Sequence, residues 1–166
     1  MRRAITAQRL THRPLPLKEN AMKTVKELLR GKGYQVWSIG PDATVYEALT
    51  LMAEKDVGAL LVLDSAGHLV GVLSERDYAR KIVLKGKTSR ETPVREIMTE
   101  KVVWVRPDQT IEECMALMTN KRIRHLPVLE GGRLLGVISI GDVVKDIISE
   151  QEFMIEQLEN YITGKR

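Results

Sequence analysis

The chain has 166 residues, 43% of them hydrophobic, and a formal net charge of +4; it is long enough to bury one sizeable core and too short for several large domains. No stretch approaches the roughly 18 consecutive apolar residues that cross a bilayer, and the basic N-terminus lacks the apolar segment of a secretory signal, so a cytoplasmic protein without a membrane span is expected. Lysine and arginine are spread along the chain without an aromatic-rich basic stripe, which disfavours nucleic acid as a partner.

Residues 1–35 are predicted to form an N-terminal extension, with a basic lead followed by a short helical piece, TVKELLR. The lead contains His12. Neither this histidine nor the other two, His68 and His125, has the spacing or the cysteine and carboxylate neighbours of a metal site. No metal is therefore expected.

An internal repeat organises the rest of the chain. The sequence from Pro41 to Val83 aligns with that from Pro107 to Ile148 when one residue is removed from a turn, and the two share Pro-Asp, Thr, Leu-Met, Val-Leu, Gly-Val, Ser and Asp at matching positions. The copies define four further segments of the chain. These are a first repeat (36–85), a linker (86–101), a second repeat (102–149) and a C-terminal helical extension (150–166).

Each copy predicts the order strand, helix, strand, strand, helix. The β-branched and aromatic runs at 36–39 and 102–105 are typical of strands, and Thr44 and Thr110 then begin helices with apolar residues at helical spacing. The single cysteine, Cys114, lies in the second of these helices and is expected to be a buried thiol. Turn-like SAG and GG sequences join the next two strands into hairpins. An α/β (α+β) fold follows, in which the two β-α-β-β-α copies pack through a pseudo-two-fold contact.

The last helix continues through ISEQEFMIEQLENYIT, where Phe153, Ile155, Leu158 and Ile162 form an apolar stripe. A stripe of this kind has to be buried somewhere. A helix of a partner subunit is favoured over the chain's own body, so a homodimer is expected.

Two heptapeptides, GVLSERD (71–77) and GVISIGD (136–142), each end an apolar run and begin a helical one. A Ser followed three residues later by an acid has the spacing of a helix capping box. The same spacing suits a nucleotide, because a helix start attracts phosphate and an ionised Asp accepts both hydroxyls of a ribose. The glycine removes a side chain that would crowd a ligand, or it marks a β-bulge. The spacing alone leaves these alternatives open.

Two such motifs in register inside a duplicated unit resemble a tandem pair of CBS domains, the regulatory modules named after cystathionine β-synthase, over residues 36–148. The helix openings PDAT and PDQT and the stretch RIRHLPVLEGGRLLGVIS carry the same resemblance. It implies a module of the stand-alone bacterial type with two clefts between the repeats. Such clefts bind adenine nucleotides such as AMP, ATP or NAD, and the signal passes through dimerisation or a regulated protein partner.

By motif position, the resemblance implies that Asp77 and Asp142 hold ribose hydroxyls, while Ser74 and Ser139 contact ribose or phosphate. The adenine is expected among apolar groups at the flanks of VWSI, VGALL and IRHLPV. These assignments make an adenosine-containing small molecule the expected ligand.

Arg76, Arg124 and His125 are the residues expected to contact phosphate, because guanidinium groups match its geometry. The alternative is that the two arginines are solvated surface charges and that the histidine is half-buried and hydrogen-bonded. The first copy has VGA at 57–59 where the second has IRH, so the basic groups do not repeat. If the three side chains converge, one cleft is richer in phosphate donors than the other.

No nucleophile with a base, metal cluster or pair of carboxylates with separated pKa values can be assembled from the sequence, so an enzyme is not expected. The alternative function is a basic protein that binds nucleic acid or a membrane surface. Its binding would weaken steeply with salt, whereas an adenosine held by Asp and apolar groups would respond less.

Overall fold

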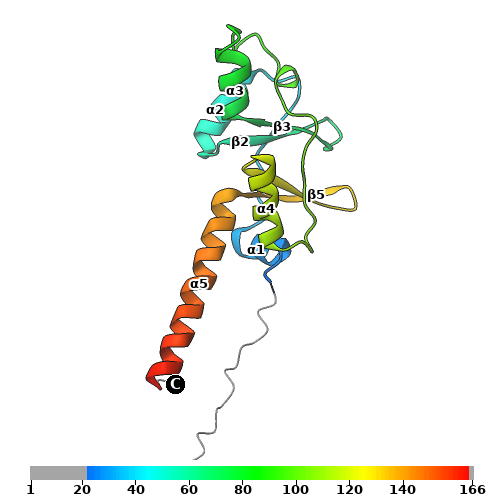
Figure 1. Cartoon of the computed structure of the whole chain (residues 1–166). Helices are drawn as coiled ribbons and strands as arrows, with labels where there is room; N and C mark the ends of the chain where they lie inside the picture. The colour runs from blue at the N-terminus through cyan, green and yellow to red at the C-terminus, as the bar shows by residue number, and fades with distance from the viewer. Residues whose placement is uncertain (1–21, 165–166) are drawn as a thin grey trace, which may run out of the picture.

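A computed structural model describes residues 22–164, so the basic lead with His12 lies outside the described residues. Two units of similar build are stacked, and the last helix extends away from them (Figure 1). Both units have the mixed α/β build that the repeat predicts. In chain order the elements are α1 (Val25–Lys32), β1 (Ser38–Ile39), α2 (Val45–Lys55), β2 (Ala59–Leu63), β3 (Leu69–Ser74), α3 (Glu75–Tyr78), the π-helical segment η1 (Ala79–Val83), the 3-10 turn η2 (Val94–Glu96), α4 (Ile111–Lys121), β4 (His125–Glu130), β5 (Arg133–Ser139) and α5 (Ile140–Thr163).

Both predicted hairpins are present: β2 pairs antiparallel with β3, and β4 with β5. β1 adds to β2 in parallel. The strand predicted at 102–105 is wrong in extent, because it is reduced to a single parallel bridge from Val105 to β4. In the first repeat the Leu61 N–H donates to the Trp37 carbonyl at 3.2 Å. The matching residue of the second repeat is Pro127, which has no N–H to donate.

The threonine helix starts are confirmed. Thr44 and Thr110 accept hydrogen bonds of 3.1 and 3.2 Å from the backbone N–H three residues on, and the glutamate at that position accepts from the threonine N–H. Cys114, in α4, is fully buried as expected. Burial raises the pKa of its thiol to about 11. The thiol is therefore protonated at neutral pH and behaves as an apolar core group.

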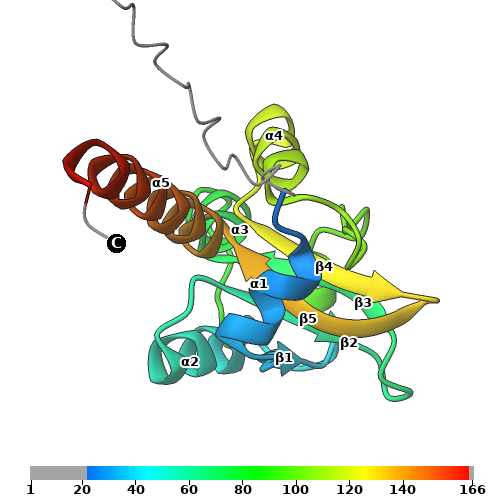
Figure 2. The same cartoon turned by 90° about the horizontal axis from the view of Figure 1, so that it is seen from below.

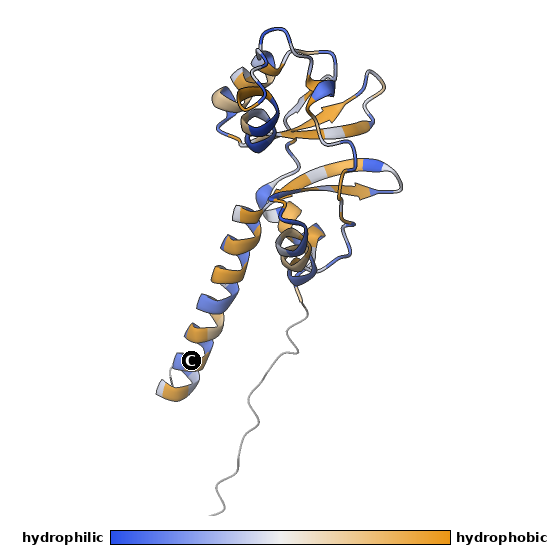
Figure 3. Ribbon diagram, turned by 45° about the horizontal axis from the view of Figure 1, so that its top comes forward, coloured by the Kyte–Doolittle hydropathy of each residue, from blue (hydrophilic) through white to orange (hydrophobic). Residues whose placement is uncertain are grey.

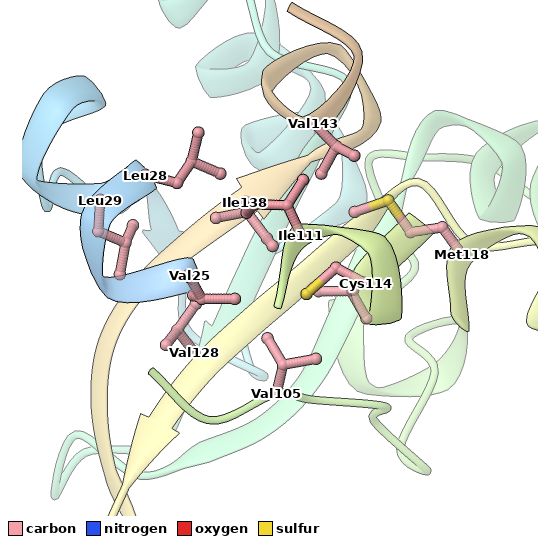
Figure 4. Close-up of a cluster of buried hydrophobic side chains, with 11 residues drawn as sticks. Val25, Leu28, Leu29, Val105, Ile111, Cys114, Met118, Val128, Ile138 and Val143 are labelled. Atoms are coloured by element: carbon pink, nitrogen blue, oxygen red, sulfur yellow. The ribbon is translucent and has the colours of Figure 1, made fainter. Parts of the chain in front are cut away.

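α1 precedes the first repeat in the sequence but packs into the core of the second. Thr24 starts it with a capping box, and Figure 2 shows it lying across the hairpin of β4 and β5. Its residues Val25, Leu28 and Leu29 are buried against α4, β4, β5 and the start of α5 (Figure 4). The TVKELLR piece of the N-terminal extension thus completes the second core.

The converse crossover joins the segment ahead of the second repeat to the first core. Val94 and Ile97, in and after η2, are buried among α2, β2 and β3. The backbone contacts match those of α1: the Val94 N–H donates to the Ala43 carbonyl at 2.8 Å, as the Val25 N–H does to the Gln109 carbonyl at 2.9 Å. Each core therefore contains a segment that precedes the other repeat in the sequence. These two crossings join the repeats into one unit.

The glycines of the two heptapeptides make room for these crossing segments. A Cβ at position 71 would lie 2.6 Å from the Met98 Sδ, and one at position 136 would lie 3.0 Å from the Leu29 Cδ2. The register of each hairpin also shifts just beyond the residue paired with the glycine. The sequence left two explanations for these glycines, room for a ligand or a β-bulge. The structure has an irregular strand at each glycine, packed closely against a crossing segment.

α5 is anchored by its first two turns, where Val143 and Asp146 are buried. Beyond them it extends past the body and carries hydrophobic residues along its length (Figure 3). The four apolar residues of the predicted stripe are between 42% and 80% exposed, so the described part of the chain does not bury them. Among the described residues, no helix is both long and apolar enough to span a membrane.

Candidate functional site

Two clefts lie where the repeats face each other. The Asp142 cleft has a volume of about 380 Å³ and is lined by the junction of β5 and α5 on one side and by residues 56–61, around the start of β2, on the other. The Asp77 cleft has a volume of about 440 Å³ and is lined by the junction of β3 and α3 and by residues 121–125 at the start of β4. Each cleft therefore takes its Ser-x-x-Asp motif from one repeat and its opposite wall from the other. Both volumes fall within the roughly 300–1,000 Å³ of ligand pockets.

The capping interpretation of both motifs is confirmed. The backbone N–H of Ser74 donates to Asp77 Oδ2 at 2.9 Å, and that of Ser139 donates to Asp142 Oδ2 at 2.8 Å. In return, each aspartate N–H donates to the serine hydroxyl, which completes two capping boxes. The caps do not turn the side chains away, since all four residues line a cleft. The glycines of the two motifs, Gly71 and Gly136, line neither cleft.

Each aspartate also pairs with a lysine. Lys81, one turn further on, lies 2.9 Å from Asp77 Oδ1, whereas Lys32 reaches Asp142 Oδ2 from the end of α1. Burial acts to raise the pKa of Asp142, but hydrogen bonds from Lys32 and from the Ser139 N–H outweigh it and lower the pKa below its usual value. Asp142 is therefore ionised at neutral pH, the form in which both oxygens accept hydrogen bonds.

Arg76, Arg124 and His125, expected to contact phosphate, all line the Asp77 cleft. The Arg76 guanidinium also donates to the Arg122 carbonyl at 3.1 Å, which links the first repeat to the second. The three residues therefore share one cleft. Contact between these side chains and a ligand stays a prediction.

His125 lines both clefts. Burial lowers the pKa of its imidazole, the nearby Lys32 and Arg124 lower it further, and Asp142 opposes them. The ring is therefore neutral at pH 7 and offers one donor and one acceptor instead of a positive charge. The ring is partly buried, which fits that part of the alternative considered for the histidine.

The two clefts differ in charge. The Asp142 cleft has two carboxylates, Asp56 and Asp142, and one ammonium group, from Lys32. The Asp77 cleft has only two acids among its lining residues, against five basic side chains. These are Arg76, Arg80, Lys121, Arg122 and Arg124. An anion with several charges is therefore attracted more strongly to the Asp77 cleft.

Apolar groups of the kind expected around an adenine occur mainly in the Asp142 cleft. Trp37, Val57, Leu60 and Leu61 line it, and they come from the two stretches VWSI and VGALL. In the Asp77 cleft, Ile123 of the IRHLPV stretch lies at the wall. Apolar residues of the expected stretches therefore line both clefts, and most of them line the Asp142 cleft.

Sequence reasoning missed several lining residues. Arg122 and Asp56 occupy matching positions of the two copies, directly after α4 and α2, and both have a left-handed backbone with φ of 53°. The first repeat has an acid at this position and the second has a base. Comparing the two positions in the sequence would have shown this further difference in charge between the clefts. Lys32 carried no such signal, because it is 110 residues from its partner Asp142.

Comparison with known proteins finds CBS domains both in the family model that matches and in the similar proteins. The family model for the CBS domain matches residues 25–84 and 94–149. The first range begins at α1 and the second at η2, the two segments that cross between the cores. A curated relative, the mitochondrial CBS domain-containing protein CBSX3 of Arabidopsis thaliana, is 38% identical over 150 residues, which is 85% of this chain and 72% of the relative.

Solved structures give the same result. A protein with CBS domains from Burkholderia ambifaria MC40-6 is 50% identical, with a TM-score of 0.74, and the match covers 78% of this chain and 96% of that one. The hexameric CBS-CP12 protein of bloom-forming cyanobacteria is 32% identical, with a TM-score of 0.65, over 74% of this chain and 69% of that one.

Proposed function

The chain belongs to the CBS-domain family, and from this premise we propose that it is a regulatory module that binds adenine nucleotides in the two clefts between its repeats. The observation that carries the proposal is that the aspartate of each repeat lines a cleft whose opposite wall belongs to the other repeat. A ligand in either cleft contacts both repeats. It therefore stabilises one relative arrangement of them, which is the basis of a regulatory response.

Capping and ligand binding are compatible at the same carboxylate. An ionised carboxylate has about four lone-pair positions on its two oxygens. At Asp142 the Ser139 N–H and Lys32 both use Oδ2, and no described residue donates to Oδ1. The cap holds the Asp142 side chain in place, and its remaining positions accept the two hydroxyls of a ribose. At Asp77 the Ser74 N–H and hydroxyl use Oδ2 and Lys81 pairs with Oδ1, so fewer positions remain. Ser74 and Ser139 then lie beside the sugar or its phosphate.

The Asp77 cleft has more basic side chains than the Asp142 cleft, and this difference supports different ligand preferences of the two clefts. Arg76 and Arg124 are fixed positive charges with forked donors, and they serve a ligand with more than one phosphate, such as ATP, in the Asp77 cleft. Neutral His125 contributes a hydrogen bond. The chain binds without catalysis in this proposal, and the cytoplasmic location stays a prediction.

Binding to nucleic acid or a membrane surface is not favoured. The five basic side chains of the Asp77 cleft gather in a concave site instead of along an open face. Concave sites of this size suit small ligands. The affinity for the uncharged adenosine is expected to respond little to salt, in contrast to the steep dependence of binding along a polyanion.

Replacing Asp77 or Asp142 by asparagine tests the proposal. Asparagine keeps an oxygen that accepts the serine N–H, so the cap is retained, but it loses the charge and replaces one acceptor by a donor. In calorimetry with AMP, ATP and NAD, each variant is expected to lose one of two sites, with about a tenfold or greater loss of affinity there.

Asp108→Asn, at an exposed aspartate outside both clefts, is the control and is expected to leave both sites unchanged. The double variant Asp77→Asn with Asp142→Asn is expected to bind no nucleotide. Two single variants that keep the parent stoichiometry and affinity would show that the aspartates only cap helices.

The exposed stripe of α5 supports self-association as part of the proposal. Ile155, Leu158 and Ile162 recur at spacings of three and four residues, so they share one face of the helix, whereas Phe153 of the predicted stripe lies on the opposite side. The cyanobacterial relative is described as hexameric, and we assign this face to a second copy of the chain. A regulated protein partner would then respond to the dimer.

Sedimentation velocity tests the assignment. Ile155→Glu with Leu158→Glu places two charges in the stripe and is expected to convert a dimer into a monomer, because a charge is costly to bury in an apolar contact. Ser149→Glu with Asn160→Glu adds the same charge on the other side of the helix and is expected to remain dimeric. A parent chain that is monomeric over a broad concentration range contradicts the assignment.

A further inference from the structure

Lys32 is placed in the Asp142 cleft by the fold and belongs to neither heptapeptide motif. It lies in the last turn of α1, its side chain is 28% exposed, and it lines the cleft. Its ammonium group contacts Asp142 Oδ2 and donates to the Val137 carbonyl at 2.9 Å. An ammonium group has three donors, so one N–H remains for a further acceptor in the cleft.

Lys32 is also the only lysine or arginine among the described residues that line this cleft. The other side chain able to carry positive charge, His125, is kept neutral at pH 7 by burial, which lowers its pKa. Two carboxylates, Asp56 and Asp142, face the same space. Without Lys32 the cleft would present only negative charge to an approaching anion.

We propose that Lys32 is the specificity-determining residue of the Asp142 cleft and selects adenosine ligands that carry an anionic group over neutral ones. This inference rests on the proposed nucleotide binding and names the ligand class of one site. A ribose accepted by Asp142 brings its 5′ substituent into a small cleft with one ammonium group. A phosphate there takes the remaining N–H of Lys32, while a neutral 5′-hydroxyl gains no charge pairing.

A second contact of α1 provides a matched control. Lys23, just before the helix, pairs with Asp146 of α5, one turn beyond Asp142. The two lysines therefore hold the two ends of α1 to the same helix α5. Lys23 does not line the Asp142 cleft. A variant of Lys23 weakens the attachment of α1 without removing the cleft's positive charge.

Fluorescence reports binding at this cleft separately. Trp37 lines the Asp142 cleft, and the chain has two tryptophans. The other, Trp104, lines neither cleft and is half exposed, so Trp104→Phe leaves a single tryptophan at the site. Adenosine and AMP are titrated into this parent and into variants that add Lys32→Ala, Lys32→Arg or Lys23→Ala. Calorimetry in an Asp77→Asn background provides a second measurement.

The parent is expected to bind AMP more tightly than adenosine. Lys32→Ala is expected to weaken AMP by about tenfold and to change adenosine by no more than about twofold. Lys32→Arg is expected to retain the preference, and Lys23→Ala to leave the ratio unchanged. A ratio of AMP to adenosine affinity that is the same in Lys32→Ala as in the parent overturns the assignment of Lys32 alone. Absence of any response to both ligands in the parent contradicts the proposed function, and the inference with it.

Discussion

Replacing Leu29 by alanine is expected to lower the free energy of unfolding by about 3 kcal/mol, since Leu-to-Ala changes at buried sites cost roughly 2–5 kcal/mol. Leu29 is 1% exposed and packs in the second core, although it precedes the first repeat in the sequence. Urea denaturation followed by circular dichroism measures the loss. Arg30→Ala, at an exposed position of the same helix, is the control and is expected to change stability by less than about 0.5 kcal/mol.

The contact itself is tested by a second change. Gly136→Ala adds a Cβ 3.0 Å from the Leu29 Cδ2, and overpacking of this kind costs about 1–3 kcal/mol. In the Leu29→Ala background the leucine methyl groups are absent, so the added Cβ is expected to cost much less. A loss below about 1 kcal/mol for Leu29→Ala, or two changes that simply add, would contradict the crossing of α1 into the second core.

Removal of both Arg76 and Arg124 is expected to weaken ATP binding in the Asp77 cleft by about a hundredfold, since hydrogen bonds to charged groups are worth about 1.5–3 kcal/mol each. AMP, with one phosphate, is expected to lose less. Arg76→Ala with Arg124→Ala is measured by calorimetry in an Asp142→Asn background, which leaves only the Asp77 cleft for the ligand.

The chain offers a control with the same change of net charge. Arg95 and Arg106 are exposed arginines that pair with Asp42 and Asp108 and line neither cleft. Arg95→Ala with Arg106→Ala is expected to change ATP affinity by no more than about threefold, the general effect of a less positive protein. Equal losses in the two double variants would mean that net charge, and not the cleft, accounts for the affinity.

Much of each repeat could be predicted because its signals are local. Thr44 and Thr110 have the glutamate three residues on that a capping box requires, and the apolar positions after them recur at the helical period. The strand predicted at residues 102–105 did not form over its full length, and the cause lies in the neighbouring strand β4. Pro127 removes the N–H with which β4 would have extended the pairing.

All seven predicted site residues line a cleft, and His125 lines both. Five of them belong to the two heptapeptides, whose spacing marks the same strand-to-helix junction in each repeat, whereas Arg124 and His125 come from the stretch at the start of β4. The spacing could not decide between a cap and a ligand contact. The structure has the caps, and it also brings each aspartate to a cleft. The lining residues Lys121 and Arg122 were missed because they lie opposite the first motif only after the two repeats are packed.

The amino-acid order by itself determined the duplicated unit, its capped helices, its hairpins and the polar groups at each junction, because these depend on contacts within a few residues. Only the tertiary structure decided that α1 and η2 cross between the cores, and that Lys32 lies beside Asp142. Those contacts join segments about 50 to 110 residues apart. They form because each small sheet has to bury an apolar face that its own repeat cannot cover.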